Sequence, residues 1–261
     1  MKNKNFRYHF LMSMSISLCL FWISSVHVKA QVTDSVVIVN PQPAEMVQWT
    51  TYKAKKQKQL PRAVLNLNAG YGWRIGKITD ELNAYGKDFF SHLMSGFVWD
   101  AFFDYFFNDK FGIRTAFYQY RASHNDLARE LDTGKQGTLD VKDMITYIGP
   151  AFVFRLAFGH NSWIFTANTG MGYIEYREKQ TFVNDYSKFY GASLGVQMGV
   201  DLEYKITPQL SIGTNMRITS GEINRLDYEK NGVKWTETFD VGKGEGLGQI
   251  SLGIGFRYYF K

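Results

Sequence analysis

Apolar residues alternate with small or polar residues at a period of two along most of the chain after residue 62. In a β-strand this period places the two kinds of residue on opposite faces. We predict eight such strands, at about 63–74, 94–107, 110–122, 142–158, 162–176, 188–204, 209–220 and 246–260. An even number of antiparallel strands is typical of a closed membrane barrel.

The first and last segments indicate which face points outward. Apolar residues from Leu65 to Trp73 alternate with Asn66, Asn68 and glycines, and residues 249–260 repeat the pattern. Eight strands enclose too little space for so many aromatic rings, whereas glycine and short polar residues fit inside. The apolar face must therefore point into lipid. The predicted fold is all-β, an eight-stranded antiparallel transmembrane β-barrel.

The predicted connections alternate in length, which is the pattern of short periplasmic turns and long extracellular loops. The short turns fall at 108–109, 159–161 and 205–208, and the long loops at about 75–93, 123–141, 177–187 and 221–245. Apolar residues at helical spacing predict a short amphipathic helix in the first loop: Ile78, Leu82, Tyr85, Phe89 and Leu93.

Two further signals concern individual strands. Asn231-Gly232 lies between two alternating segments and predicts a two-residue hairpin, so strands seven and eight are expected to extend beyond the membrane. Pro150 lies inside the fourth strand, where it removes a backbone donor. We therefore predict a bulge or register irregularity at Gly149-Pro150.

The N-terminus has the features of a secretory signal. Lys2, Lys4 and Arg7 precede an apolar run, and Val28-Lys29-Ala30 forms a cleavage site, so residues 1–30 are predicted to be removed. The single cysteine, Cys19, leaves with them, which excludes an intramolecular disulfide and a thiol nucleophile. Residues 31–62 are interpreted as a flexible periplasmic leader, with a short docking strand at Val36 to Val39 as the alternative.

The net charge changes with this cleavage. The whole chain carries +6, but its mature part has 26 basic against 24 acidic residues, or +2, which is too small to predict nucleic-acid binding. Aromatic residues make up 16% of the chain, and no later segment is apolar for the ~20 residues that a membrane helix needs. The barrel domain of the mature protein, residues 63–261, is therefore expected to cross the outer membrane of a Gram-negative bacterium.

The chain resembles the outer-membrane β-barrel domain proteins of Bacteroides-type bacteria. The resemblance covers about residues 60–261 and rests on Arg62 to Ile78, Tyr147 to Phe152, Gly246 to Gly248 and the aromatic end of the last strand, Gly253 to Phe260. It implies the fold and the location, and recognition of the terminal aromatic residues by the barrel-assembly machinery. It implies no reaction.

The inward-facing positions of the predicted strands place several charged residues in the lumen. These are Asp100, Asp104, Arg114, Arg155, Asp201, Glu203 and Arg257. Buried charges are tolerated when they are paired, so we predict a salt-bridge network that plugs the barrel. The alternative is that the same network rearranges as the gate of a narrow pore.

Aromatic residues at both ends of the outward face predict interfacial girdles. The upper one includes Trp73, Trp99, Tyr147 and Tyr173. Tyr228 and Trp235 lie in the hairpin beyond that girdle and are candidates for surface contact, although they also suit a cross-strand pair.

Candidate chemistry is sparse. Ser123, His124 and Asp126 open the second loop and could supply a hydroxyl, a base and a carboxylate, but neighbouring loop residues seldom reach catalytic geometry. No metal-ligand spacing is present and no cofactor is expected. We assign no catalytic residue.

The sequence thus predicts a non-enzymatic barrel that acts through its extracellular loops in surface binding or membrane-protein assembly. The expected partners are outer-membrane lipid, the barrel-assembly machinery, and a surface ligand or neighbouring membrane protein. The alternatives are an outer-leaflet lipid acyltransferase or deacylase and a small gated pore.

Overall fold

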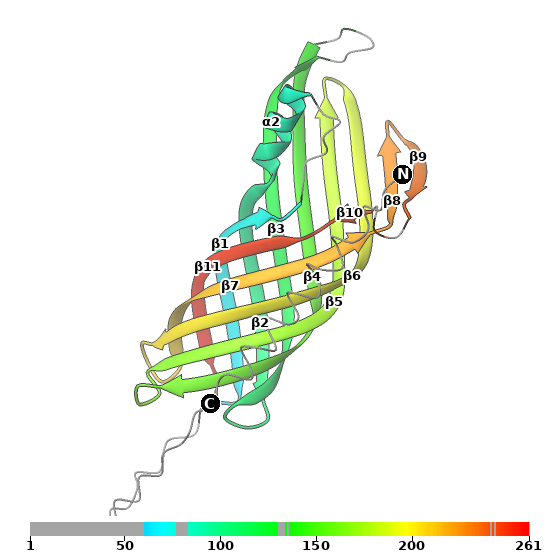
Figure 1. Cartoon of the computed structure of the whole chain (residues 1–261). Coiled ribbons are helices and arrows are strands. Elements are labelled where there is room, and N and C mark those ends of the chain that lie inside the picture. Colours follow the sequence, from blue (N-terminus) through cyan, green and yellow to red (C-terminus); the bar gives the residue numbers. More distant parts are fainter. Residues whose placement is uncertain are drawn as a thin grey trace, which may run out of the picture. The chain divides into compact units, whose positions relative to one another are not determined.

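The protein is a closed antiparallel β-barrel (Figure 1), seen in a computed structural model that describes residues 60–76, 83–129, 134, 136–240, 242 and 244–260. The strands of the ring are β1 (Ala63–Arg74), β2 (Ser95–Phe106), β3 (Phe111–Arg129), β4 (Gln136–Phe158), β5 (Trp163–Phe182), β6 (Asp185–Lys205), β7 (Leu210–Ile223) and β11 (Gln249–Tyr259). Consecutive ring strands pair, and β1 closes the ring by pairing with β11 from Val64↔Tyr259 to Arg74↔Gln249. The predicted eight-stranded fold is confirmed. The predicted signal peptide and almost all of the predicted leader lie outside the described residues.

Short polar turns join the strands at the end where β1 begins. The Asn108 side chain accepts hydrogen bonds from the backbone N–H groups of Lys110 (2.9 Å) and Phe111 (2.8 Å), which fixes the turn between β2 and β3. Between β4 and β5, Gly159, His160 and Asn161 all have positive φ, at 57°, 59° and 67°. Glycine and asparagine tolerate this left-handed conformation, so three residues suffice to reverse the chain.

The opposite end of the barrel differs from the prediction. β3 and β4 remain paired as far as Arg129↔Gln136, and β5 and β6 as far as Phe182↔Asp185. Most of 123–141 and 177–187, predicted as loops, is therefore β-sheet, and the expectation of long loops there was wrong. Figure 1 shows β3 to β6 extending well past the end of β1.

Along these long strands, the outward face changes from apolar to polar and the inward face from polar to apolar. In the barrel wall, Leu67 points outward and is 53% exposed, while Asp104 is buried inside. Beyond the level of Tyr173, the inward positions are apolar, as at Ile145, and the outward positions are charged, as at Lys179. A strand that leaves lipid meets water on its outer face and a packed interior on its inner face. The apolar side therefore has to change.

This exchange corrects one girdle assignment. Tyr147 is fully buried and faces the interior, whereas Trp73 and Tyr173 are exposed on the outer face, at 41% and 43%. Tyr147 lies where the inward positions become apolar, so an aromatic residue there no longer indicates the lipid side.

Pro150 is accommodated without a bulge. β3 pairs with β4 without interruption through Thr115↔Pro150. On the β5 side the ladder breaks after Ile148↔Tyr173 and resumes at Ala151↔Gly170 in the same register. The predicted bulge or register irregularity was therefore wrong, because the register is kept and the sheet omits two pairings rather than inserting a residue.

The predicted amphipathic helix is confirmed as α2 (Ala84–Leu93). Its N-terminus is capped by Asn83, whose side chain accepts a 2.8 Å hydrogen bond from the N–H of Gly86. Phe89 and Leu93 are buried, and Tyr85 is 45% exposed. Ile78 and Leu82 lie outside the described residues. No helix in the described part of the chain has the length and apolar character needed to cross a membrane.

The predicted hairpin is confirmed as β8 (Arg225–Lys230) and β9 (Val233–Thr238), joined by Asn231 and Gly232 with φ of 49° and 85°. β8 continues the line of β7 and pairs with β6, from Ser187↔Lys230 to Gly191↔Leu226. The last strand does not extend with it, since β11 starts at Gln249 and a short strand, β10 (Glu245–Gly246), pairs with β7. Only one of the two expected strands therefore reaches beyond the membrane.

Candidate functional site

The half of the lumen nearest the short turns holds a network of ion pairs centred on Asp201. Arg217 contacts its Oδ1 at 2.7 Å, Arg114 its Oδ2 at 3.1 Å, and Arg257 its Oδ1 at 3.5 Å. Arg114 also donates to both oxygens of Asp104, from Nε at 2.6 Å and from Nη2 at 2.8 Å. This two-point contact fixes the guanidinium plane and is the strongest geometry available to such a pair.

Asparagines extend the network around the wall. Asn66 donates to Asp104 at 3.0 Å. Asp100 accepts hydrogen bonds from Asn68 and, at 3.2 Å, from Asn215, and lies 3.6 Å from Nε of Arg217. The buried carboxylates are thus paired with cations and amide donors, which offsets their desolvation.

The seven predicted lumen residues all lie in the interior, but they do not form a single ion-pair network. Arg155 donates to the carbonyls of Asp109 (3.1 Å) and Pro61 (3.0 Å), and its guanidinium lies 3.7 Å from the ring centre of Phe106. Glu203 accepts a hydrogen bond from Ser211. These two charges therefore belong to the periplasmic end of the lumen rather than to the Asp201 network.

Arg217 is a lumen residue that the sequence interpretation missed. It is 1% exposed and stacks over Phe102, with 4.0 Å between its guanidinium carbon and the ring centre. The strand pattern could have found it, because Ser211 and Asn215 occupy inward positions of β7 and Arg217 continues that series. A side chain at the inward-facing Gly199 would collide with its Nη1, so this glycine provides the space. With Arg217, the buried guanidinium groups of this half equal the buried carboxylates in number.

The upper half of the lumen is filled by an apolar cluster. α2 supplies Phe89 and Leu93, which pack with Tyr120, Val141 and Ile145 from β3 and β4. The Tyr120 hydroxyl donates a 2.8 Å hydrogen bond to the carbonyl of Leu93, which satisfies a backbone acceptor at the end of the helix. The lumen is therefore filled in two layers, apolar above and charged below.

The candidate catalytic cluster does not assemble. Ser123 and His124 are consecutive residues of β3, so their side chains lie on opposite faces of the sheet. His124 stacks on His92 of α2 with 4.3 Å between the ring centres and contacts Phe89 at 4.9 Å. The histidine thus packs the helix against the sheet and is turned away from Ser123. Among the described residues no group of three or more His, Cys, Asp or Glu side chains could hold a metal ion.

The two candidate contact residues pair across the hairpin. Tyr228 and Trp235 lie opposite each other, with stacked rings whose centres are 5.3 Å apart, and Phe189 of β6 meets Tyr228 edge-on at 5.1 Å. Trp235 is 46% exposed. Burial and then a hydrogen bond with the Glu237 carboxylate raise the pKa of Tyr228 to about 12, so its hydroxyl stays protonated. Phe189, Tyr228 and Trp235 thus form an aromatic group beside the Glu237 carboxylate on the inner face of the extracellular sheet.

The edge of β9 has free backbone groups. The N–H of Phe239 bonds to the carbonyl of Asn224, and in this ladder the alternate residues Val233, Trp235 and Glu237 face β8. The N–H and C=O groups of Lys234, Thr236 and Thr238 therefore point away from β8, and β9 pairs with no other strand of the described chain. Such an edge is a template for an added strand.

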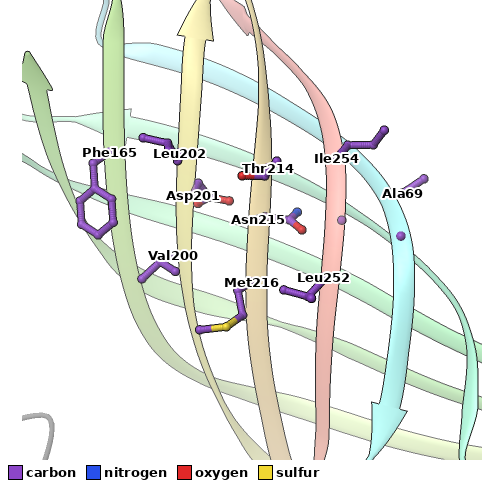
Figure 2. Close-up of a pocket in the computed structure, with 12 residues that line it drawn as sticks. Ala69, Phe165, Val200, Asp201, Leu202, Thr214, Asn215, Met216, Leu252 and Ile254 are labelled. Atoms are coloured by element: carbon purple, nitrogen blue, oxygen red, sulfur yellow. The ribbon is translucent and has the colours of Figure 1, made fainter. Parts of the chain in front are cut away.

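The outer wall of the barrel has a shallow apolar depression of about 480 Å³. Its lining includes Ala69 and Thr214, and Figure 2 shows Leu202, Met216 and Leu252 around it. In a lipid-facing wall such a hollow receives acyl chains.

These features define the class of the protein. A closed barrel satisfies every strand's hydrogen bonds within the wall, and this one carries an outward apolar band and a polar interior. The chain is an outer-membrane β-barrel protein.

Comparison with known proteins finds similar solved structures but no matching family. No family model and no curated protein matches the chain. One similar solved structure is Neisserial surface protein A, with 13% identity, a TM-score of 0.46, and coverage of 76% of this chain and 97% of that chain. A second is Ail, the attachment invasion locus protein of Yersinia pestis, in complex with the heparin analogue sucrose octasulfate, with 16% identity, a TM-score of 0.43, and coverage of 76% of this chain and 99% of that chain. A third is a major outer membrane protein from Thermus thermophilus, with 14% identity, a TM-score of 0.49, and coverage of 76% of this chain and 99% of that chain. At these identities the likeness concerns the fold alone.

Proposed function

We propose that this protein is a non-enzymatic surface receptor that binds an extended segment of a partner protein along β9. The observation that carries the proposal is the free edge of β9, which presents the backbone groups of Lys234, Thr236 and Thr238 beside the exposed ring of Trp235. Main-chain hydrogen bonds supply affinity when a strand is added to a sheet edge, and alternate side chains supply specificity.

Support also comes from the rest of the molecule. The two-layered filling of the lumen favours a binding role over a pore, and the separation of Ser123 from His124 removes the candidate catalytic pair. We further propose export by cleavage after Ala30 and membership of the Bacteroides-type family, both of which rest on the sequence. A partner that binds to β9 on the extracellular side does not have to pass through the filled lumen.

The test uses a backbone donor that faces the free edge. Thr236→Pro removes one edge N–H and leaves the β8 ladder intact, whereas Thr236→Val keeps the donor and the β-propensity. A photo-crosslinking residue at position 238, in the full chain in its native outer membrane, should yield one protein adduct. Mass spectrometry should map the adduct to an extended segment of the partner.

We expect the adduct to be retained in Thr236→Val and lost in Thr236→Pro, and the amides of residues 234–238 to gain hydrogen-exchange protection when the partner is added. Heat-modifiable migration on gels reports folding of the barrel in both variants. An adduct that survives Thr236→Pro, or one formed only with lipid or glycan, would reject strand addition.

A further inference from the structure

Three lysines lie side by side on the outward face of the extracellular sheet. Lys142 of β4 pairs directly with Lys179 of β5, and Lys179 with Lys188 of β6. The residues that continue this row are Ser123 on one side and Glu229 and Lys234 on the other. We call Lys142, Lys179 and Lys188 the lysine row.

Like charges at directly opposed positions of a sheet repel each other, since their Cβ atoms are only about 5 Å apart. The neighbouring acids offset this repulsion only at the ends of the row. Lys142 lies 3.0 Å from Asp140 and Lys188 lies 3.9 Å from Glu229, while Lys179 forms no ion pair with any described residue. The centre of the row therefore carries uncompensated positive charge on exposed side chains.

The surroundings add further cations and aromatic rings. In the next row towards the membrane, Arg121 and Arg177 point outward. Arg177 is paired with Glu175 at 2.6 Å and lies 5.7 Å from the ring centre of Tyr190. Tyr186 and Tyr190 are 37% and 38% exposed on the same face. Exposed cations pair with phosphate groups, and the exposed tyrosine rings add apolar contact area beside them.

The distance of the lysine row above the membrane surface indicates which kind of ligand can reach it. Lys179 follows Tyr173 of the upper girdle by six residues on β5, which is about 20 Å along the strand, or about 15 Å above the girdle at the usual barrel tilt. The phosphate of a glycerophospholipid lies at the level of the girdle itself. A ligand at the lysine row must therefore reach up from the leaflet, as the head group of a large glycolipid does.

We propose that the lysine row binds the phosphate groups of a phosphorylated glycolipid in the outer leaflet. The outward face holds the lysine row together with Asp140 and Glu229, whereas the inner face of the same sheet carries Asp143, Glu178 and Glu237. The site is therefore confined to the face turned towards surrounding lipid. This site is independent of the β9 edge and goes beyond the proposed function. It would anchor the sheet to the membrane surface while the hairpin contacts its partner.

The test compares two double variants that remove the same charge. Lys179→Gln with Lys188→Gln alters the lysine row. Lys110→Gln with Lys230→Gln alters a periplasmic turn and the opposite face of the sheet. Each full-length protein is placed in phosphatidylcholine nanodiscs and titrated with phosphorylated lipid A that carries its inner-core sugars, or with the same glycolipid after phosphatase treatment.

We expect the lysine-row variant to bind the phosphorylated glycolipid roughly tenfold more weakly, as two exposed ion pairs would allow, and added salt to reduce the difference. The Lys179→Arg, Lys188→Arg variant should bind as the natural chain does, which separates lost charge from lost folding. Equal binding of the phosphatase-treated glycolipid, or equal weakening in the control variant, would overturn the proposal. Binding of heparin but not of the glycolipid would also overturn it in favour of a soluble polyanion.

Discussion

Arg217 of β7 donates a 2.7 Å hydrogen bond to Asp201 of β6 in the lower half of the barrel interior. Asp201 also receives Arg114 and Arg257, so one carboxylate serves three guanidinium groups. The interior of the lower barrel therefore depends on Asp201 more than on any of its partners taken singly.

The first prediction follows from this imbalance. Asp201→Asn keeps the shape of the side chain but removes the carboxylate charge that three buried guanidinium groups share, which should destabilise the barrel by about 3–5 kcal/mol. Urea unfolding in detergent, followed by heat-modifiable migration, measures the change. The matched control is Asp227→Asn, an exposed acid with side-chain exposure of 45%, which should change stability by less than about 0.5 kcal/mol. Equal stability of the two variants would show that the Asp201 network does not support the fold.

The barrel wall was predictable from sequence because one rule holds throughout it. Outward residues are apolar and most inward residues are small or polar, so Asn66 and Leu67 already reveal their faces; Phe102 and Phe106 are inward exceptions that pack under the lumen arginines. The same rule fails above the girdle, where water replaces lipid. There Val141 is buried inside and Lys142 is exposed outside, which is the reverse assignment. The long extracellular strands and the inward position of Tyr147 were missed for this reason.

The site was predictable only in part. Local alternation identified the inward charges, yet which acid meets which base depends on the register of strands far apart in sequence, as for Arg114 and Asp201. The lysine row has the same origin, because three lysines separated along the chain become neighbours only when β4, β5 and β6 are aligned. The stacking of Tyr228 on Trp235 could be anticipated, since a two-residue turn fixes its register.

A second prediction concerns conduction. The charged network and the apolar cluster close the lumen in series, so the natural chain should show no steady current in planar bilayers. Arg217→Ala opens space only in the lower layer and should leave the current at baseline. Combining Arg217→Ala with Phe89→Ala and Tyr120→Ala should produce a measurable leak, because it opens both layers. A leak from Arg217→Ala alone would show that the apolar cluster does not seal the upper lumen.

The last prediction concerns pH and the extracellular carboxyl pair Asp143 and Glu178. Asp143 lies inside the sheet extension, where burial and then repulsion from Glu178 raise its pKa from 3.8 to about 7, although Arg74 at 3.3 Å opposes the shift. The Tyr176 hydroxyl lies between the two carboxyls, donating to Asp143 at 3.4 Å and also to Glu178. Asp143 therefore keeps a proton in the folded state at a pH where the unfolded chain has lost it.

The sign of the pH dependence follows from that proton. Since the folded state binds more protons than the unfolded state between pH 3.8 and about 7, the stabilisation is complete below this window and is lost as the pH rises through it. The free energy of local opening, measured by hydrogen exchange at the extracellular ends of β4 and β5, should fall with a slope of at most about 1.4 kcal/mol per pH unit. Asp143→Asn should remove this slope and Asp140→Asn, on the outward face, should retain it. A slope of opposite sign, or one that persists in Asp143→Asn, would place the titrating group elsewhere.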